Sequence, residues 1–417
     1  MLLKVQNTQT QLTGTVKITG SKSETNRLLL LQALFKGITI KNLSNSDDGK
    51  LMQKALLSDS ETIDIHHAGT AMRFLTAYFA IQKGRKTILT GSSRMQERPI
   101  GILVDALRSL GAEITYQKNE GYPPLSIQGT TLVKSEVTLK ANVSSQYISA
   151  LMLIGATLPE GLTIVLEGKI TSVPYINMTL QLLHQLGIEA SFKDQSIKIS
   201  PTQLDDFKKT ITVESDWSSA SYYYSIVAMM HKSDDNNPTQ ITISSYKQDS
   251  LQGDAVLAEI YTKLGVISRF DGHQLNLQLD TSKKLPEVLE LDLSNSPDIA
   301  QTIAVSCFGL GIACDLTGLH TLKIKETDRL EALKAEITKL GGTIEVTDKA
   351  LHLKKRNTPI KENCTIATYH DHRMAMAFAP LGLCVPICIE DAGVVSKSYP
   401  DFWEDLKTFG FKQEIIG

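Results

Sequence analysis

The chain has 417 residues, and about two or three domains are expected because a chain of this length exceeds what one hydrophobic core usually serves. Its 43 basic and 45 acidic residues are interspersed and leave a formal net charge of −2, which excludes the whole-surface positive field of a nucleic-acid or membrane-surface binder; anion binding must be local. The first residues lack a signal-peptide pattern and no run approaches roughly 18 apolar residues, so we expect a cytoplasmic protein.

A helical pattern recurs six times along the chain. Each copy is rich in Ala, Leu, Met and Ile, opens on small, polar or charged residues and is apolar nearly all round, which predicts a buried helix. Successive copies begin about 75 residues apart, except that the first interval is only about 47. The six segments are 21–34, 68–80, 144–156, 218–230, 296–310 and 371–383.

An amphipathic helix that runs through Leu-Gly into a strand recurs with the same period. Its glycines are Gly111, Gly187, Gly265 and Gly341, with a weaker copy at Gly410. Glycine suits a helix end because it adopts the left-handed conformation without a Cβ clash. A repeat of roughly 70 residues is too small to stand alone, so we expect an α/β fold of two domains with three repeats each, in which strands and outer helices cover the buried helices.

The N-terminal ends of the buried helices would suit a multiply charged anion, although ordinary N-capping explains any single copy. In the first copy, Lys22 and Arg27 lie roughly one and a half helical turns apart, and Ser23 stands beside Lys22. These residues predict a cradle for phosphate or carboxylate. The alternative is a surface lysine beside an N-cap serine.

The next motif, RMQERPIG at 94–101, places Arg98 before a proline, which favours an extended backbone. An arginine held in this way can bind a carboxylate or phosphate through two parallel hydrogen bonds. The alternative is a surface pair of Glu97 with an arginine, which contributes under about 1 kcal/mol.

Two motifs in the second half combine acidic and basic residues. Asp298 opens the fifth buried helix, where N-capping is the alternative interpretation. In KETDRL at 325–330, we expect Thr327 to be the N-cap of a helix that has Lys325 before it and Arg329 in its first turn. Two cations at a positive helix end are unfavourable unless an anion binds there, although a solvated, salt-bridged face is the alternative.

The last motif, DHRMAMAF at 371–378, opens a buried helix rich in Met and Ala, and its Met residues are typical of core packing. We expect Arg373 to contact a ligand, whereas His372 either donates a hydrogen bond or serves as a core or capping histidine. The last third also contains all five cysteines, which form no CxxC pair and are expected to be reduced core residues without a structural metal. They are Cys307, Cys314, Cys364, Cys384 and Cys388.

Together these motifs are similar to the motif series of the 5-enolpyruvylshikimate-3-phosphate synthases, in the same order along essentially the whole chain. The segments are SKSETNR, AGTAMR, RMQERPIGILVDAL, SSQY, SVPYI, SDWSSASYY, SPDIAQTIA, KETDRL and DHRMAMAF. The resemblance implies the two-domain enolpyruvyl transferase fold, with six βαβαββ units and an active site in the interdomain cleft. With the repeat, it predicts one domain at 20–213 and another at 1–19 plus 214–417.

The resemblance also implies an activity and its substrates. The enolpyruvyl group of phosphoenolpyruvate would pass to the 5-hydroxyl of shikimate 3-phosphate, in aromatic amino-acid biosynthesis, by a monomer without cofactor. Residues implied to hold shikimate 3-phosphate are Lys22, Ser23, Arg27, Ser144, Ser145, Gln146, Ser172, Tyr175, Asp298, Thr321 and Lys325. Residues implied to surround phosphoenolpyruvate are Lys22, Gly69, Arg98, Gln146, Arg329, Arg373 and Lys397.

The chemistry needs acid–base groups near both reacting carbons. We assign Asp298 as the base toward the hydroxyl, Glu326 as the proton shuttle at the methylene carbon and Lys22 as a supporting acid or electrostatic stabiliser. Departures from the family pattern, which bear on substrate affinity and glyphosate sensitivity, are a shortened segment at 56–65, His67 for asparagine, Phe74 for proline, Val173 for lysine and Thr321 for asparagine. Gly69, whose missing side chain leaves room for glyphosate, is retained.

Two alternative functions are consistent with parts of the sequence. The sister enolpyruvyl transferase that acts on UDP-N-acetylglucosamine usually has a reactive cysteine in a mobile loop, but the corresponding segment GSSRMQERPIG has none. A catalytically silent protein that only binds phosphate ligands would not require the carboxylates of Asp298 and Glu326. Both alternatives are therefore disfavoured by the sequence.

Overall fold

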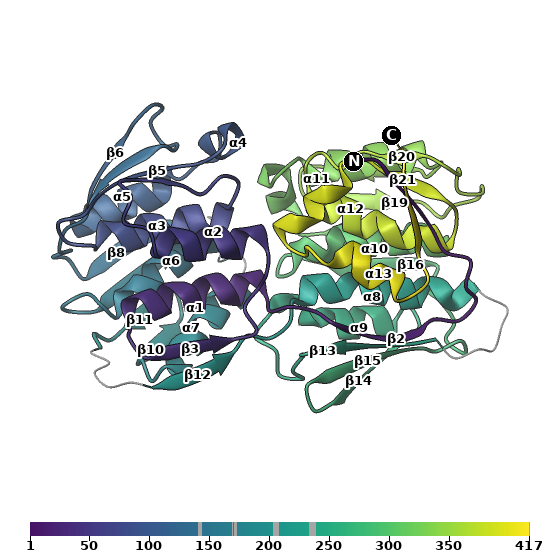
Figure 1. Ribbon diagram of the computed structural model, residues 1–417, viewed down its shortest axis with the longest axis horizontal. Coiled ribbons are helices and arrows are strands. Elements are labelled where there is room, and N and C mark those ends of the chain that lie inside the picture. The colour runs from purple at the N-terminus through teal and green to yellow at the C-terminus, as the bar shows by residue number, and fades with distance from the viewer. Residues whose placement is uncertain (141–143, 169, 171–172, 203–207, 233–238, 417) are drawn as a thin grey trace. The chain divides into compact units, whose positions relative to one another are not determined.

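The computed structural model describes residues 1–140, 144–168, 170, 173–202, 208–232 and 239–416. The chain folds into two compact parts: an N-terminal domain, Gly20–Val213, and a C-terminal domain made of Met1–Thr19 and Glu214–Gly417. Within each domain the strands lie at the periphery and helices fill the interior (Figure 1). Among the described residues, no helix is both long and apolar enough to cross a bilayer.

The N-terminal domain is built around three buried helices that contact one another: α1 (Lys22–Leu34), α3 (Gly69–Ala80) and α6 (Ser145–Gly155). Its strands form sheets ordered β4-β5-β7-β6 and β10-β11-β9-β8 and the parallel pair β12-β3. The strands are β3 (Ile38–Lys41), β4 (Thr62–Asp64), β5 (Lys86–Thr90), β6 (Glu113–Tyr116), β7 (Leu125–Gln128), β8 (Glu136–Lys140), β9 (Leu162–Glu167), β10 (Ala190–Lys193), β11 (Ser196–Ile199) and β12 (Lys209–Thr212). The other helices are α2 (Asp47–Leu56), α4 (Ser93–Gln96), α5 (Gly101–Leu110) and α7 (Val173–Gln185).

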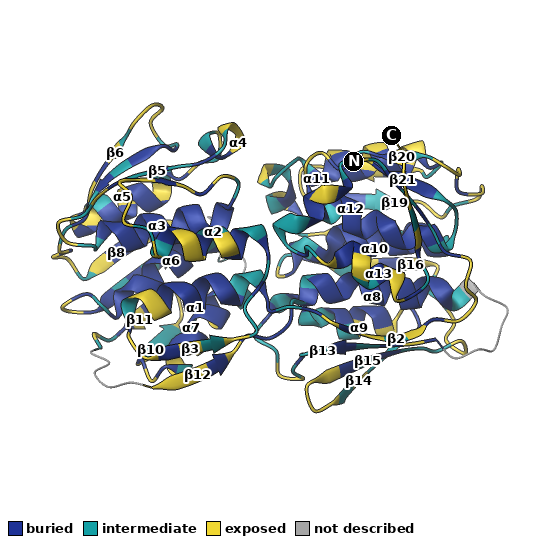
Figure 2. Ribbon diagram, viewed as in Figure 1, coloured by how far each residue is buried: buried dark blue, intermediate teal, exposed yellow. Residues whose placement is uncertain are grey.

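The C-terminal domain repeats this plan around α8 (Trp217–Met229), α10 (Ala300–Leu310) and α12 (His372–Phe378). In both domains the buried helices are dark blue along most of their length (Figure 2). Other helices are η1 (Met230–Lys232), η2 (Gly253–Val256), α9 (Leu257–Thr262), η3 (Pro297–Ile299), η4 (His320–Ile324), α11 (Arg329–Lys339), η5 (Ala379–Leu383), η6 (Ala392–Lys397) and α13 (Phe402–Lys407).

The first residues of the chain form two strands that belong to sheets of the C-terminal domain. Their strand orders are β14-β15-β13-β2, β16-β17-β19-β18 and β20-β21-β1-β22, so β1 and β2 pair with strands more than 200 positions away. The strands are β1 (Leu3–Gln6), β2 (Thr13–Lys17), β13 (Gln240–Ser244), β14 (Val266–Asp271), β15 (Gln274–Leu279), β16 (Val288–Asp292), β17 (Ala313–Thr317), β18 (Ile344–Val346), β19 (Ala350–Leu353), β20 (Thr365–Ile366), β21 (Ile387–Ile389) and β22 (Lys412–Ile415).

The predicted α/β fold of buried helices covered by strands and outer helices is confirmed. Sheets in both domains share one plan: a parallel pair such as β4 and β5, followed by an antiparallel hairpin such as β6 and β7. The predicted glycine helix ends also hold, with φ of +110° at Gly111 and +97° at Gly341. One helix is shorter than expected: α12 gives way to the 3₁₀ helix η5 near Pro380, which has no N–H to continue an α-helix.

Candidate active site

The N-terminal domain holds a buried arginine close to the start of α1. Arg27 is 2% exposed and donates from Nε to Thr179 Oγ1 (2.8 Å) and from its terminal nitrogens to Ser149 Oγ (2.9 Å) and the Ser23 carbonyl (2.8 Å). These acceptors join α1 to α6 and α7, but all are neutral. Burial lowers the pKa of Arg27 to about 10, so at neutral pH it remains a buried cation that would be stabilised by an anionic ligand.

Two more guanidinium groups lie at the start of α3. A Cβ atom on Gly69 would stand 2.5 Å from Arg98 Nη1 and 2.9 Å from Nη2, so the Arg98 guanidinium rests against this glycine. Arg73, 4% exposed, donates to the Gly69 carbonyl (3.1 Å) and the Pro99 carbonyl (2.9 Å). Burial and the charge of Arg98 lower the pKa of Arg73 to about 10. Two adjacent cations at a helix start, of which Arg73 donates to neutral carbonyl groups, favour anion binding at this helix end.

The remaining predicted residues of this domain lie at the starts of α1, α6 and α7. Lys22 opens α1, where the N-cap serine makes no side-chain cap, whereas Ser144 does cap α6 by accepting from Gln146 N (3.3 Å). The Gln146 amide donates to Thr70 Oγ1 (3.2 Å), which links α6 to the start of α3, and Ser145 is buried. The Tyr175 ring lies 5.9 Å from the Arg27 guanidinium carbon, and Ser172 lies outside the described residues.

In the C-terminal domain, the carboxylate of Asp298 is surrounded by three cations. Its Oδ1 lies 2.9 Å from Arg329 Nη1 and 3.3 Å from Lys325 Nζ, and its Oδ2 lies 3.5 Å from Arg373 Nη2. Burial alone would raise the pKa of Asp298, but the charges of Lys325, Arg373 and Arg329 outweigh burial and lower it well below its usual range. The N-capping interpretation of Asp298 is wrong, because α10 has no side-chain cap.

Arg329 is the centre of a wider ion-pair network. Its side chain is 2% exposed and also contacts Asp371 Oδ2 through Nε (2.6 Å) and Glu326 Oε2 through Nη2 (2.8 Å). Burial would lower its pKa, but these carboxylates outweigh burial and raise it. The alternative of a solvated face is therefore wrong for Arg329. The expected N-cap Thr327 is also wrong: Asp328 caps α11 by accepting from the N–H groups of the second and third helical residues.

Arg373 faces the same carboxylate from the start of α12. Its Nη1 donates to the Asp298 carbonyl (3.1 Å), and its Nη2 donates to Ser218 Oγ (3.2 Å) at the start of α8. Asp371 caps α12 by accepting from Arg373 N (2.9 Å). His372 is buried, at 2% exposure.

Two predicted residues of the C-terminal domain lie apart from these ion pairs. Lys397 Nζ donates to the carbonyl of His370 (2.7 Å). The hydroxyl of Thr321 is buried without a hydrogen-bond partner among the described residues.

Sequence reasoning missed Arg73, Asp371 and Asp254 as part of these arrangements. Arg73 follows Gly69 by one helical turn on an otherwise apolar helix, which was a usable signal. Asp371 stood inside a quoted motif, but its pairing with a residue 42 positions earlier has no sequence signature. Asp254 hydrogen-bonds Ser218 across 36 positions and gave no signal at all.

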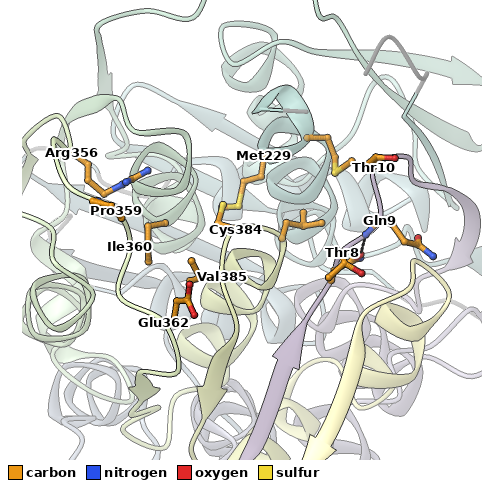
Figure 3. Close-up of a pocket in the computed structure, with 13 residues that line it drawn as sticks. Thr8, Gln9, Thr10, Met229, Arg356, Pro359, Ile360, Glu362, Cys384 and Val385 are labelled. Carbon is orange, nitrogen blue, oxygen red and sulfur yellow. Dashed lines mark hydrogen bonds between the residues drawn. The ribbon is translucent and has the colours of Figure 1, made fainter. Parts of the chain in front are cut away.

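A separate pocket of about 490 Å³ lies in the C-terminal domain, among Thr8, Met229, Arg356, Glu362 and Cys384 (Figure 3). None of the predicted site residues lines it. Arg356 at its edge donates to the carbonyl of Thr358 and lies over the Phe308 ring. Among the described residues, no group of three or more His, Cys, Asp or Glu is placed to hold a metal ion.

Comparisons with known proteins agree on one family. The family model described as EPSP synthase (3-phosphoshikimate 1-carboxyvinyltransferase) matches residues 6–59 and 53–406. A relative from Bacteroides fragilis strain ATCC 25285, named 3-phosphoshikimate 1-carboxyvinyltransferase, is 47% identical over 405 residues and 96% of each chain. A relative of the same name from Shewanella woodyi is 35% identical over 422 residues, 94% of this chain and 96% of its own.

Solved structures show the same fold. The EPSP synthase from Acinetobacter baumannii superposes with a TM-score of 0.79 over 100% of both chains, at 19% sequence identity. The enolpyruvyl transferase NikO from Streptomyces tendae superposes with a TM-score of 0.75 over 99% of this chain and 98% of its own, at 15% identity. At these identities the structural likeness concerns the fold alone.

Proposed function

The chain belongs to the EPSP synthase (3-phosphoshikimate 1-carboxyvinyltransferase) family, and from this premise we propose that it transfers the enolpyruvyl group of phosphoenolpyruvate to the 5-hydroxyl of shikimate 3-phosphate. Phosphate is the second product. The reaction belongs to the shikimate pathway of aromatic amino-acid biosynthesis. The observation that carries the proposal is the Asp298 carboxylate among three cations, because a proton acceptor inside an anion-binding site is what this transfer requires.

The charges of the two substrates suit the cations of the chain. Two phosphates and two carboxylates carry about six negative charges at pH 7. The proposed partners are Lys22, Arg27, Arg98, Lys325, Arg329, Arg373 and Lys397. The side chains of Arg27 and Arg73 donate to neutral acceptors, and the Arg98 guanidinium rests against Gly69 beside Arg73, so an anionic ligand would stabilise these cations. We propose that the 20–213 domain supplies the shikimate 3-phosphate contacts of Lys22, Ser23, Arg27, Ser144, Ser145, Gln146, Ser172 and Tyr175.

Asp298 is the proposed base toward the 5-hydroxyl. In the structure, three cations keep its pKa well below the usual range, which makes the carboxylate ionised but weakly basic. The anionic groups of phosphoenolpyruvate would compete for Arg329 and Arg373. Each cation drawn away from Asp298 raises its pKa toward the range of an effective base. Substrate binding would therefore activate the base.

Glu326 is the proposed proton shuttle at the methylene carbon. Its Oε2 is 2.8 Å from Arg329 Nη2, and its side chain is 26% exposed, so it can exchange protons with solvent. Protonation of the methylene and attack of the hydroxyl on the adjacent carbon give a tetrahedral intermediate that still bears the phosphate. Removal of a methyl proton then expels phosphate, while Lys22 and the arginines stabilise the developing charge. Thr321 and Lys325 contact shikimate 3-phosphate in this proposal, and Gly69, Gln146 and Lys397 contact phosphoenolpyruvate.

Product analysis tests the proposal directly. Phosphorus NMR of the purified protein with both substrates should show free phosphate and a new phosphomonoester, identified by mass as the enolpyruvyl ether. Asp298→Ala should abolish both signals, whereas Asp348→Ala, at an exposed surface pair with Lys323, should not. Unchanged substrates with the wild-type protein would refute the function. We further propose that the protein acts in the cytoplasm as a monomer.

A further inference from the structure

The aspartate Asp254 has no role in the mechanism above, yet it stands beside the proposed base. It lies in η2, is 5% exposed and accepts a hydrogen bond from Ser218 Oγ through Oδ2. The same Ser218 Oγ accepts from Arg373 Nη2 at 3.2 Å. The three groups thus form a chain that leads from a buried carboxylate through a hydroxyl to a proposed phosphoenolpyruvate ligand.

The chemistry of the three groups determines which one donates in each of these hydrogen bonds. A guanidinium can only donate, so Ser218 must present a lone pair to Arg373. A serine hydroxyl has one proton, which must then point elsewhere. The Ser218 hydroxyl donates this proton in a hydrogen bond to the Asp254 carboxylate. A charge-assisted hydrogen bond of this kind is strong and directional. Asp254 therefore determines which side of the Ser218 oxygen faces Arg373.

The segment that carries Asp254 is anchored to the surrounding elements. The Gly253 carbonyl accepts from Ser296 Oγ (2.9 Å), two residues before Asp298. The Gln252 side chain accepts from Trp217 N (3.0 Å) and donates to the Ser215 carbonyl (2.9 Å). Asp254 is thus held against both the turn of Asp298 and the start of α8, so its carboxylate has a fixed position from which to orient Ser218.

We propose that Asp254 is a positioning residue for phosphoenolpyruvate: acting through Ser218, it holds the Arg373 guanidinium in the orientation that binds this substrate. The inference rests on the proposed function, because it assumes that Arg373 contacts phosphoenolpyruvate. Arg373 is held on its other side by the Asp298 carbonyl. Loss of the Ser218 contact would leave the guanidinium free to turn toward Asp298 Oδ2, only 3.5 Å away.

The position of Asp254 also predicts a pH dependence. Burial, and next the charge of Asp298, raise the pKa of Asp254 to about 6; Arg373 opposes this rise, and Asp216 adds to it. Below that pH the protonated carboxyl group becomes a donor and competes with Arg373 for the Ser218 oxygen. The apparent affinity for phosphoenolpyruvate should therefore fall as the pH drops through about 6. The phosphate group of phosphoenolpyruvate also changes its charge near pH 6. The KM for phosphoenolpyruvate must therefore be compared between wild type and variant at each pH.

Four variants test the proposal: Asp254→Asn, Ser218→Ala, their combination, and Asp249→Asn as a control on an exposed residue of the same loop. The KM for phosphoenolpyruvate should rise about tenfold in Asp254→Asn and in Ser218→Ala, while the KM for shikimate 3-phosphate changes less than about twofold. The double variant should be no worse than Ser218→Ala alone, because Asp254 acts through the serine. Asp254→Asn should also lack the wild-type decline near pH 6.

The possible outcomes distinguish a failure of this inference from a failure of the proposed function. An active wild type whose Asp254→Asn variant keeps its KM for phosphoenolpyruvate refutes the inference alone. A double variant whose rise in KM for phosphoenolpyruvate equals the product of the two single rises also refutes the inference. An equal rise in both KM values, together with a lower melting temperature, refutes it as well. If Asp254→Asn does not fold, an unchanged KM for phosphoenolpyruvate in Ser218→Ala refutes it equally. A wild type without turnover refutes the proposed function, and the inference falls with it.

Discussion

Replacement of Gly69 by alanine should impair phosphoenolpyruvate binding without unfolding the protein. The new Cβ would stand 2.5, 2.9 and 3.0 Å from Nη1, Nη2 and Cζ of Arg98, whereas unstrained contacts lie near 3.5 Å, so the guanidinium must retreat by about 1 Å. The backbone can accept alanine because Gly69 begins α3 in a helical conformation. A displacement of about 1 Å in a substrate-positioning group can reduce catalytic efficiency on the order of 100-fold, or about 2.7 kcal/mol.

Steady-state kinetics with each substrate varied in turn measures this effect. The kcat/KM for phosphoenolpyruvate should fall by about 10²-fold, with the KM for shikimate 3-phosphate nearly unchanged and the melting temperature preserved. Gly393→Ala is the control, because a Cβ there meets no atom within 4 Å. A Gly69→Ala protein with wild-type kinetics would show that Arg98 does not position this substrate. Loss of the folded state would show that the glycine serves packing instead.

Three further predictions concern the ion pairs. Arg329→Met removes the guanidinium that pairs with the buried carboxylates of Asp371 and Asp298, although Lys325 and Arg373 still contact Asp298. The variant should therefore lose about 3–5 kcal/mol of the free energy of unfolding in urea, and a loss under about 1 kcal/mol would contradict the network. Because cations hold the pKa of Asp298 below its usual range in the folded state, its ionised form stabilises the fold above about pH 4, and this stability is lost on further acidification. Asp298→Asn should therefore show a shallower loss of stability between pH 5 and 3 than the wild type in urea titrations, and an identical slope would contradict this. Shikimate 3-phosphate at about 100 times its Kd should stabilise the wild type by about 2.7 kcal/mol in thermal unfolding. Arg27→Met should lose this stabilisation at the same concentration. Equal stabilisation of both proteins would show that Arg27 does not bind shikimate 3-phosphate.

Features of the fold that are local in sequence were predictable. The buried helices follow from runs such as 68–80, in which every residue of α3 is buried, and the glycine helix ends follow from a backbone requirement that only one residue type meets easily. The N-cap of α11 was misplaced by one residue because Thr327 and Asp328 are both good caps in adjacent positions, and only the observed backbone distinguishes them.

Long-range polar contacts were not predictable. The pairing of Arg329 with Asp371 joins residues of two consecutive repeats, and that of Ser218 with Asp254 joins residues 36 positions apart within one repeat. Neither spacing nor composition predicts such contacts. The motif residues were singled out because charges at helix starts are costly without a partner. The sequence does not reveal that carboxylates of the same chain supply part of the negative charge that offsets these cations, as they do for Arg329.

The most direct test of the account is phosphate release by the purified protein, measured with both substrates and with each omitted in turn. The proposed transfer predicts release only when phosphoenolpyruvate and shikimate 3-phosphate are present together, and none from Asp298→Ala. Release from phosphoenolpyruvate alone, or binding of both substrates without release, would contradict it.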